Sequence, residues 1–326
     1  MSLITPLKLG NKTFSNNLIQ GPLAGLSCSP FRRLIWQYSK PAFSCTEMIS
    51  CKTLIHQSDH AVKRFINKAT DEGPVCFQLS GSDASELAEA TKMATAYGAD
   101  LIDLNCGCPV KKIRSKGAGS RLLTEPSKLY HLITAMKQNT HVPVSIKIRV
   151  EDVARTEKFN RNIAQVIQDA GADFLVVHGR HWTEHYETPC RHDEIKFFVD
   201  EVKIPVIGNG DIACSSSLKT MLATGCAGAM IARSGVGQPW LIAKLIAEMN
   251  QEPFQTPSLQ ETCSILIEHV SDLSQLLNGE KFAIIQARKF AKYYARQLSH
   301  RVEFCNEINH CETMQQFISI CKTYFN

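Results

Sequence analysis

The chain lacks the long apolar runs that a membrane-spanning helix needs. Its 326 residues are 44% hydrophobic, but no stretch of about 18 consecutive apolar residues occurs. The first ten residues also lack the basic start and the small-residue cleavage site of a secretory signal peptide. Because the composition is too apolar for a disordered chain, we expect a folded cytoplasmic protein that is not held in a membrane.

The sequence has many cysteines, but its cysteines and histidines do not have the spacing of a metal site. The thirteen cysteines include no Cys-x-x-Cys pair with partner histidines at zinc spacing. Their number is odd, the chain is long and a secretory signal is missing, so reduced thiols are expected rather than a disulfide framework. We therefore predict no metal site.

Acidic residues are missing from two short segments. Lys111 to Arg121 holds five basic residues and no acid, and Lys281 to Arg301 holds six basic residues and no acid. The whole chain has a net charge of only +5, so the remainder carries −6. Two short segments thus make an otherwise acidic protein basic.

Eight short apolar runs recur along the chain, each followed by a turn and then by helical periodicity. They are too uniformly apolar to alternate, as is typical of parallel strands covered on both faces. Eight such units over about 250 residues predict an α/β fold, the (β/α)8 TIM barrel. A doubly wound open sheet is the alternative, but Gly21–Gly25 after the first run lacks its Gly-x-Gly-x-x-Gly pattern. The expected strands are Asn17–Gln20, Ala42–Met48, Val75–Leu79, Leu101–Asn105, Val144–Arg149, Phe174–His178, Pro205–Gly208 and Ala229–Arg233.

Helix boundaries and a linker complete the expected organisation. Asp83 is a predicted N-cap, Pro126 a predicted helix start, and Gly98, Gly171 and Gly225 are predicted to end helices ahead of strands. A polar, proline-containing stretch at 251–258 precedes a region with helical periodicity alone. We predict a catalytic barrel over residues 1–250 and a small all-helical domain over residues 251–326.

Polar side chains gather at the ends of the expected strands, where TIM barrels carry their chemistry. Each residue has a structural interpretation too: Glu47 and Asp211 could be caps or ion-pair partners, and His178 a satisfied core histidine. Together they predict an active site. The set comprises Glu47, Gln78, Asn105, Cys108, Lys147, His178, Asn209, Asp211 and Arg233.

Three features of this set indicate specific chemistry. A buried Lys147 needs an anionic or carbonyl partner, so it could form a Schiff base or hold an electron-rich cofactor. Cys108 follows a strand and precedes a proline, which suits a buried structural thiol poorly. The glycine-rich ends Gly208–Asp211 and Ala232–Gly235 are typical of the phosphate site after strands 7 and 8 of a barrel.

The order of these motifs resembles the tRNA-dihydrouridine synthase family, in particular its bacterial type B branch. The most specific element is Asp103–Lys112, which reads Asp-Leu-Asn-Cys-Gly-Cys-Pro-Val-Lys-Lys. The other elements are Pro22–Gly25, Thr46–Met48, Gln78–Asp83, Lys147–Arg149, Val177–Arg180, Asn209–Asp211, Ala232–Arg233 and Ala287–Lys289.

The resemblance implies non-covalent FMN and reduction of uracil in tRNA to dihydrouracil, with NADPH as the hydride source. It assigns the proton donor to Cys108, although Cys106 is a second thiol in the same element. A flavin hydride would go to C6 of the uracil, and a thiol over C5 would deliver the proton. By the same resemblance, the cofactor-binding residues are Pro22, Leu23, Ala24, Gln78, Lys147, His178, Asn209, Gly210, Asp211, Ala232 and Arg233.

The chain departs from the family pattern at a few positions. Leu23 stands where methionine is frequent, and Ala232 replaces a glycine. His181-Trp182 replaces the common Thr-Arg at a position where the resemblance implies an RNA or flavin-edge contact.

The basic segments suggest the partner, tRNA, bound by a protein that we expect to be a monomer. Arg288, Lys292 and Arg296 follow i, i+4, i+8, so like charges are expected to stack on one helix face, where a polyanion would favour them. Phe290 is expected to pack inside the domain. The predicted RNA-binding residues are Lys111, Lys112, Arg114, Arg288, Lys289, Lys292 and Arg296.

Three other functions remain open at this point. A small-molecule FMN oxidoreductase of the dihydroorotate dehydrogenase type would explain the barrel but not the basic tail. A lyase that forms a Schiff base on Lys147 would need no flavin. A non-catalytic RNA-binding module would leave the polar strand ends unused.

Overall fold

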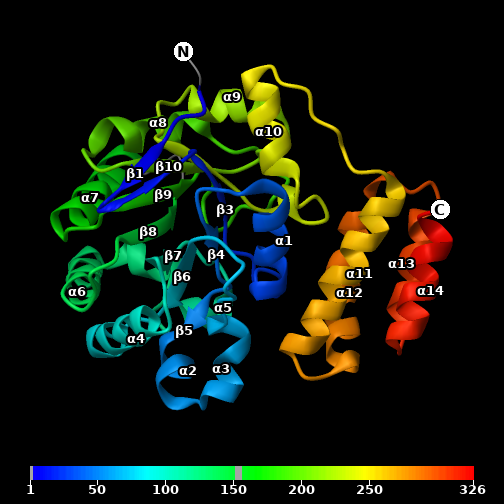
Figure 1. Cartoon of the computed structure of the whole chain (residues 1–326). Helices are drawn as coiled ribbons and strands as arrows, with labels where there is room; N and C mark the ends of the chain where they lie inside the picture. The colour runs from blue at the N-terminus through cyan, green and yellow to red at the C-terminus, as the bar shows by residue number, and fades with distance from the viewer. Residues whose placement is uncertain (1–2, 151–155) are drawn as a thin grey trace.

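A closed barrel of eight parallel strands forms the centre of the molecule, as the computed structural model shows for residues 3–150 and 156–326 (Figure 1). Strand β11 pairs with β3, and β4 pairs with β6, so the sheet closes on itself. The predicted (β/α)8 barrel is confirmed. The barrel strands are β3 (Leu18–Gln20), β4 (Ser44–Cys45), β6 (Val75–Ser80), β7 (Leu101–Cys106), β8 (Val144–Arg149), β9 (Phe174–His178), β10 (Val206–Asn209) and β11 (Gly228–Ile231).

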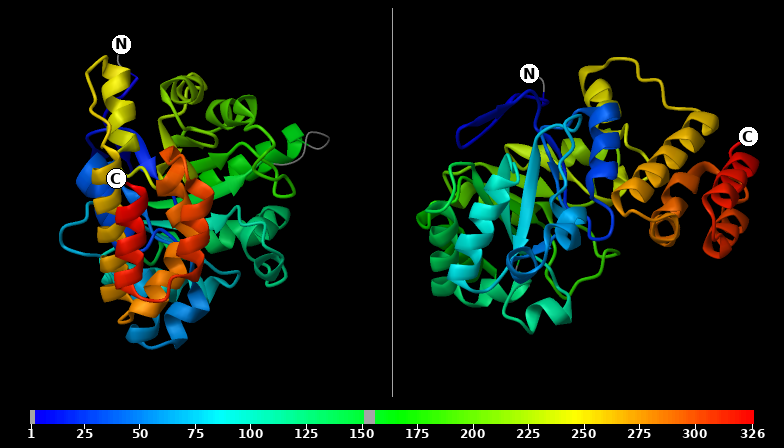
Figure 2. Two further views of the ribbon diagram at one scale, coloured as in Figure 1. Left: turned by 90° about the vertical axis from the view of Figure 1, so that its right-hand side faces the viewer. Right: turned by 60° about the horizontal axis from the view of Figure 1, so that its bottom comes forward.

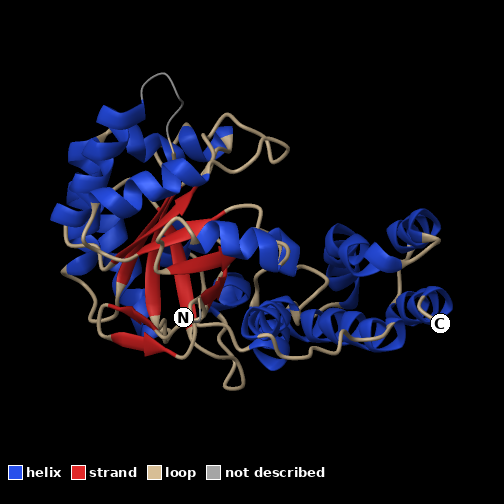
Figure 3. Cartoon of the chain, turned by 90° about the horizontal axis from the view of Figure 1, so that it is seen from above, coloured by secondary structure: helices blue, strands red, loops and turns tan. Residues whose placement is uncertain are grey.

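Helices pack against the strands on several sides, as Figure 3 shows with the strands in red and the helices in blue. Asp83 caps α4 by accepting the N–H groups of Ser85 and Glu86, and Pro126 opens α6. Gly98, Gly171 and Gly225 all have positive φ, as expected for helix ends. The helices are α1 (Ser29–Ser39), α2 (Cys51–His56), α3 (Asp59–Ile66), α4 (Ala84–Ala96), α5 (Lys111–Arg114), α6 (Pro126–Lys137), α7 (Thr156–Asp169), α8 (His192–Glu201), α9 (Ser215–Leu222) and α10 (Leu241–Asn250).

Two expected strands ran well past the end of the observed strand, whereas the run Asn17–Gln20 began only one residue before β3. The run Ala42–Met48 gives only β4, because the Thr46 side chain accepts the N–H of Gln78 (3.0 Å) in place of a backbone carbonyl. A separate short strand, β5 (Ile49–Ser50), then pairs with the end of β6. The run Ala229–Arg233 ends at Ile231, because the backbone turns at Ala232 into a 3₁₀ turn, η3 (Arg233–Gly235).

The expected strands omitted an antiparallel hairpin at the start of the chain. It consists of β1 (Leu7–Leu9) and β2 (Lys12–Phe14). Leu7, Leu9 and Phe14 join Phe43 and Phe174 in one apolar cluster. The hairpin therefore closes the barrel at the end opposite to the C-terminal strand ends, and the alternation Leu-Lys-Leu was its signal in the sequence.

A helical region follows the barrel and lies beside it, joined by the extended segment after α10 (Figures 1 and 2). Its apolar core includes Phe31, Leu34 and Ile35 of α1 together with Phe290 of α12. The core of the helical region therefore packs against α1 of the barrel. Its elements are α11 (Leu259–Leu276), α12 (Glu280–Tyr294), the 3₁₀ turn η4 (Ala295–Gln297), α13 (Arg301–His310) and α14 (Met314–Tyr324).

Candidate active site at the barrel mouth

The register of the strands brings the predicted site residues to one level at the C-terminal end of the barrel. Asn105 of β7 lies opposite Lys147 of β8, and His178 of β9 lies opposite Asn209 of β10. Because parallel strands end on the same edge, these side chains from distant parts of the sequence meet at the mouth.

A chain of hydrogen bonds runs from a buried carboxylate to the loop after β7. The Gln78 amide donates to Asp103 (2.8 Å), and the Asn105 amide donates to Gln78 Oε1 (2.9 Å). Asn105 Oδ1 then accepts the backbone N–H of Cys108 (2.9 Å). Since Asp103 accepts from Ser145 as well (2.6 Å), the carboxylate fixes the direction of both amides and hence the start of the Cys108 loop.

The two thiols of the Cys-Gly-Cys element lie in different surroundings. Cys106 is fully buried in the barrel core, and burial raises the pKa of its thiol well above the usual value. Cys108 is half-buried, and its carbonyl accepts the N–H of Ser120 (3.1 Å). Of the two thiols, Cys108 is the one that a substrate at the mouth can reach.

Lys147 provides a half-buried positive charge beneath the mouth. Its ammonium donates to Asn209 Oδ1 (2.8 Å), and the Asn209 amide donates to the carbonyl of Met230 (2.8 Å). Burial lowers the pKa of Lys147, and the nearby carboxylate of Asp103 opposes that change. Burial in turn raises the pKa of Asp103. An ammonium bonded to a neutral amide can hold a further electron-rich or anionic group.

Arg180 connects several parts of the mouth. Its side chain is 1% exposed and donates to Asp211 (2.5 Å) and to the backbone carbonyls of Tyr186 (3.1 Å) and Thr188 (2.5 Å). Its Nη1 lies 3.1 Å from His178 Nε2. Burial alone would raise the pKa of Asp211, but the hydrogen bond from Arg180 leaves it lowered. The Asp211 carboxylate is therefore held by Arg180, the ion-pair interpretation that the sequence also allowed.

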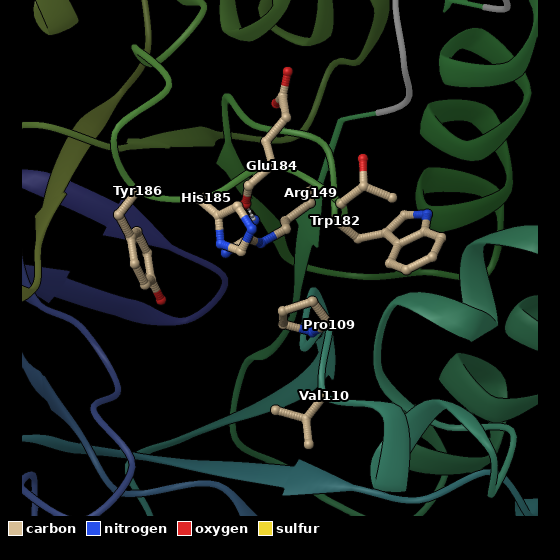
Figure 4. Close-up of a pocket in the computed structure, with 8 residues that line it drawn as sticks. Pro109, Val110, Arg149, Trp182, Glu184, His185 and Tyr186 are labelled. Atoms are coloured by element: carbon tan, nitrogen blue, oxygen red, sulfur yellow. Dashed lines mark hydrogen bonds between the residues drawn. The ribbon is translucent and has the colours of Figure 1, made fainter.

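A cavity of about 440 Å³ opens beside the Cys108 loop. Pro109 and Val110 form one side, the segment 182–186 faces them, and Arg149 lies between (Figure 4). Arg149 donates to the backbone carbonyl of His181, the residue just before that segment (2.9 Å). The Arg233 guanidinium lies over the Tyr186 ring, 3.7 Å from its centroid. This size and mixed lining suit a planar polar ring.

The predicted cofactor residues occupy the ends of several neighbouring strands. Pro22, Gln78 and Lys147 line one narrow crevice in the barrel. A Cβ on Gly210 would lie 3.3 Å from the His178 ring, so these two residues are in close contact. The remaining residues follow β3 (Leu23 and Ala24), end β10 (Asn209, with Asp211 after it) or follow β11 (Ala232 and Arg233).

The donor chemistry of the mouth fits a phosphorylated, electron-rich cofactor such as FMN. Lys147 and Arg233 supply two positive charges. The carboxylates nearby already have partners, because Asp211 binds Arg180 and Asp103 accepts from Gln78. A positive site whose acids are satisfied within the protein favours an anionic ligand.

The seven residues predicted to bind RNA separate by residue type. The four lysines, Lys111, Lys112, Lys289 and Lys292, are exposed. The three arginines are half-buried and hold parts of the fold together. The lysines are therefore the better candidates for contacts with phosphate groups.

Each arginine of this set has a partner within the protein. Arg114 donates to Ser120 (2.7 Å) and lies over the Trp182 ring, 3.4 Å from its centroid. Arg288 donates to the carbonyl of Cys311 (2.8 Å).

Arg296 does not continue the face of α12, which was expected to carry it. The helix ends at Tyr294, and Arg296 lies in η4, where it donates to the carbonyl of Ser234 (3.1 Å). The expected row i, i+4, i+8 was therefore wrong at its last member. Phe290 is 1% exposed, as expected for a packing residue.

Some residues of the mouth were not predicted as site residues. Arg149 stands two positions after Lys147 on the same strand, and residues two apart share a face, so the period of two was an available signal. The same spacing relates Arg180 to His178. The place of Tyr186 depends on how the loop after β9 folds, and the sequence carries no signal for it.

Some features are absent from the described residues. Within 3–150 and 156–326, no group of three or more His, Cys, Asp or Glu side chains could hold a metal ion. Over the same ranges, no helix is long and apolar enough to cross a membrane. The thirteen cysteines are free thiols.

Comparisons with known proteins agree over nearly the full chain. The family described as dihydrouridine synthase (Dus) matches residues 19–326. The tRNA-dihydrouridine synthase B of Vibrio cholerae is 32% identical over 326 residues, covering 98% of this chain and 99% of the relative. Those of Pasteurella multocida and Escherichia coli K12 are each 30% identical, covering 98% of this chain and 96% and 99% of the relatives.

Proposed function

The chain belongs to the dihydrouridine synthase family, and we propose that it reduces uridines of tRNA to 5,6-dihydrouridine at the barrel mouth. The observation that carries this proposal is the placement of Cys108, a half-buried thiol beside a cavity of about 440 Å³. The chain is an oxidoreductase of this family. Neither a Schiff-base lyase nor a non-catalytic RNA-binding module is consistent with that membership.

Cys108 is the proposed proton donor. Asn105 accepts the backbone N–H of Cys108, and Asn105 is linked through Gln78 to the buried Asp103. The position of the first residues of the Cys108 loop is therefore fixed. A thiol held in this way can give its proton to C5 of a uracil in the adjoining cavity. Cys106 cannot share this role, because its side chain is sealed in the barrel core.

FMN is the proposed cofactor, and when bound it supplies the hydride for C6 of the uracil. Lys147 would face the flavin ring as a positive charge, and Gln78 and Asn209 are the amides beside it. Arg233 and the backbone of η3 would take the phosphate group. The other residues proposed to line this site are Pro22, Leu23, Ala24, His178, Gly210, Asp211 and Ala232.

Uridine in folded tRNA is stacked, so it must be extruded to enter the cavity. The exposed Lys111 and Lys112 follow the cavity wall Pro109–Val110 directly in the sequence, where they could hold the backbone beside the extruded base. Lys289 and Lys292 of α12 offer a second set of cations on the helical region, residues 251–326, which we propose as the tRNA-binding domain. Arg114, Arg288 and Arg296 would support these surfaces rather than contact phosphate.

NADPH is the proposed reductant. A cytoplasmic location follows from the proposed substrate, since tRNA is modified there, and we propose a monomer. The preference for NADPH is measured as the rate of flavin bleaching under anaerobic conditions with NADPH and with NADH. Faster bleaching with NADH would reverse the assignment.

Flavin content and tRNA modification test the proposed function. The purified protein should be yellow and release FMN on heating. Mass spectrometry of tRNA from cells with and without the gene should show dihydrouridine lost at defined positions. A colourless protein that takes up no FMN, or unchanged tRNA, would contradict the proposal. A yellow protein with unchanged tRNA would instead favour a small-molecule FMN oxidoreductase.

A further inference from the structure

Arg180 is the most buried arginine side chain at the mouth, and its contacts reach two parts of the site at once. We propose that Arg180 is a positioning residue, which holds His178 as the neutral tautomer with its proton on Nδ1 and anchors the loop that carries Tyr186. The assignment rests on hydrogen bonds within this chain. Only its consequence for the reaction rests on the proposed function.

The tautomer follows from the chemistry of the guanidinium group. A guanidinium has N–H donors and no acceptor, so His178 Nε2, 3.1 Å from Arg180 Nη1, must accept. A neutral imidazole carries one proton, which is then on Nδ1. An imidazolium would set two N–H groups against each other and place a second positive charge beside the first.

The surroundings of His178 reinforce the neutral form. Burial is the largest cause that lowers the pKa of the ring, and four cations lower it further. Asp211 offsets part of this charge, but its carboxylate is held by Arg180 (2.5 Å). The cations are Lys147 and Arg149 on β8, Arg180 after β9 and Arg233 after β11.

The same guanidinium fixes the loop after β9. Its Nε donates to the carbonyl of Thr188 (2.5 Å), and Nη2 donates to the carbonyl of Tyr186 (3.1 Å). Asp211, the ion-pair partner, also accepts the N–H of Cys190 (2.9 Å). Tyr186 is 53% exposed. Its backbone is nevertheless fixed to the barrel, because Arg180 binds its carbonyl and Asp211 binds the backbone of Cys190 in the same loop.

A fixed tautomer limits what His178 can do in the reaction. Its Nδ1 presents an N–H donor, and its lowered pKa keeps the ring from taking up a second proton at neutral pH, so it cannot act as a general acid. On the proposed function, His178 donates a hydrogen bond and Cys108 remains the proton donor.

The tautomer is measured directly by nuclear magnetic resonance on protein with ¹⁵N-labelled histidine, with the His178 signals assigned by their loss in His178→Gln. We expect an acceptor-type shift for Nε2, a donor-type shift for Nδ1 and no titration of the ring between pH 5 and 8. A protonated Nε2, or a titration in that range, would overturn the proposal. This test needs no substitution at Arg180 and no enzymatic activity.

Two substitutions separate the tautomer from the loop. Arg180→Met should abolish the acceptor state of Nε2 and speed chymotrypsin cleavage after Tyr186 by about tenfold or more, since a charged hydrogen bond is lost. Arg180→Lys keeps a cationic donor that cannot accept but lacks the fork of the guanidinium, so it should preserve the tautomer while losing loop contacts. Arg191→Met, which removes a loop contact to Glu184 (2.7 Å) without touching His178, should leave the tautomer unchanged.

An unchanged tautomer in a folded Arg180→Met protein would overturn the positioning role. If that variant does not fold, the wild-type spectrum still decides the assignment. An Nδ1 tautomer in a protein that forms no dihydrouridine would leave this proposal standing and remove the proposed function. A protonated Nε2 in an active enzyme would do the reverse.

Discussion

The barrel mouth and the segment Lys281–Arg301 of the helical region both concentrate positive charge, but they arrange it in opposite ways. At the mouth, Lys147, Arg149 and Arg180 are buried or half-buried and bonded to groups of the protein. On the helical region, Lys289 and Lys292 are exposed above a core that contains His269 and Phe290. No acid lies between Lys281 and Arg301 to neutralise them.

This difference shows how positive charge can serve two functions, the binding of a small ligand and the binding of a polyanion. Cations with fixed positions inside the mouth create a localised positive electrostatic potential. Such a potential suits a cofactor and a nucleobase that must be bound in one orientation. Exposed lysines gain from counterion release along a polyanion and need no single geometry. Arginine, with its planar fork of donors, fills the supporting positions in both regions.

The largest expected effect separates chemistry from binding. Cys108→Ala should lower the rate of dihydrouridine formation by about 10² to 10⁴-fold, the range for loss of a general acid. Binding of tRNA and reduction of the flavin by NADPH should persist. Cys305→Ala is the matched control, because Cys305 is a second half-buried thiol and lies in the helical region. Equal losses in both variants would contradict the role of Cys108.

Removal of an arginine from the helical region should cost stability rather than RNA affinity. Arg288→Ala loses the bond to the Cys311 carbonyl, so the free energy of unfolding should fall by about 1.5 to 3 kcal/mol in a urea titration. Lys289→Ala on the same helix should change it by about 0.5 kcal/mol or less. A changed salt dependence of tRNA binding in Arg288→Ala would place this arginine on the RNA surface after all.

Each region contains a buried histidine, and acid should reveal what the one in the helical region does to stability. Burial lowers the pKa of His269, which stacks on Phe290 at 4.3 Å, to about 3. The unfolded chain gains a proton below about pH 6.5 while the folded chain does not, so this histidine costs stability as the pH falls towards 3.

Between pH 7 and 5 the contribution of His269 to the free energy of unfolding should fall by about 2 kcal/mol. His269→Gln should remove this part of the pH dependence, which urea titrations at the two pH values measure. An identical pH dependence in the variant would show that the ring titrates normally.

The smallest expected effects concern the exposed lysines. Replacing Lys289 and Lys292 by Gln should weaken tRNA binding several-fold and lower the salt slope by about one per lysine. Replacing Lys111 and Lys112 should lower the slope equally and also slow turnover at saturating tRNA, because these lysines adjoin the thiol loop. Lys196→Gln, whose lysine pairs with Asp200 (3.0 Å), should leave the slope unchanged. If both pairs of substitutions slowed turnover equally, the proposal that only Lys111 and Lys112 act beside the thiol would be contradicted.

Much of the barrel could be predicted because buried parallel strands have a simple signature. The runs Val144–Arg149 and Phe174–His178 match β8 and β9 to the residue. The run Ala42–Met48 failed because the Thr46 hydroxyl replaces a backbone acceptor, a contact that depends on the neighbouring strand. The end of α12 at Tyr294 likewise depends on a tertiary contact, because Arg296 binds the carbonyl of Ser234 in the barrel.

The site could be predicted where it lies on strands and less well where it lies on loops. Lys147, His178 and Asn209 follow from the ends of apolar runs. The spacing of two residues from His178 was a signal for Arg180. Tyr186 takes its place through a contact of its backbone carbonyl within one loop, and such a contact leaves no periodic pattern. The division between exposed lysines and supporting arginines likewise depends on tertiary contacts, such as Arg114 over Trp182.

The central claim is that this mouth reduces uridines of tRNA rather than a small molecule. The purified flavin-loaded protein, supplied with NADPH, should be given dihydrouridine-free tRNA, free uridine or orotate in parallel, with products identified by mass spectrometry. The account predicts that defined tRNA positions gain the mass of two hydrogens while the small molecules stay unchanged. Turnover of a small molecule with no change in tRNA would contradict it.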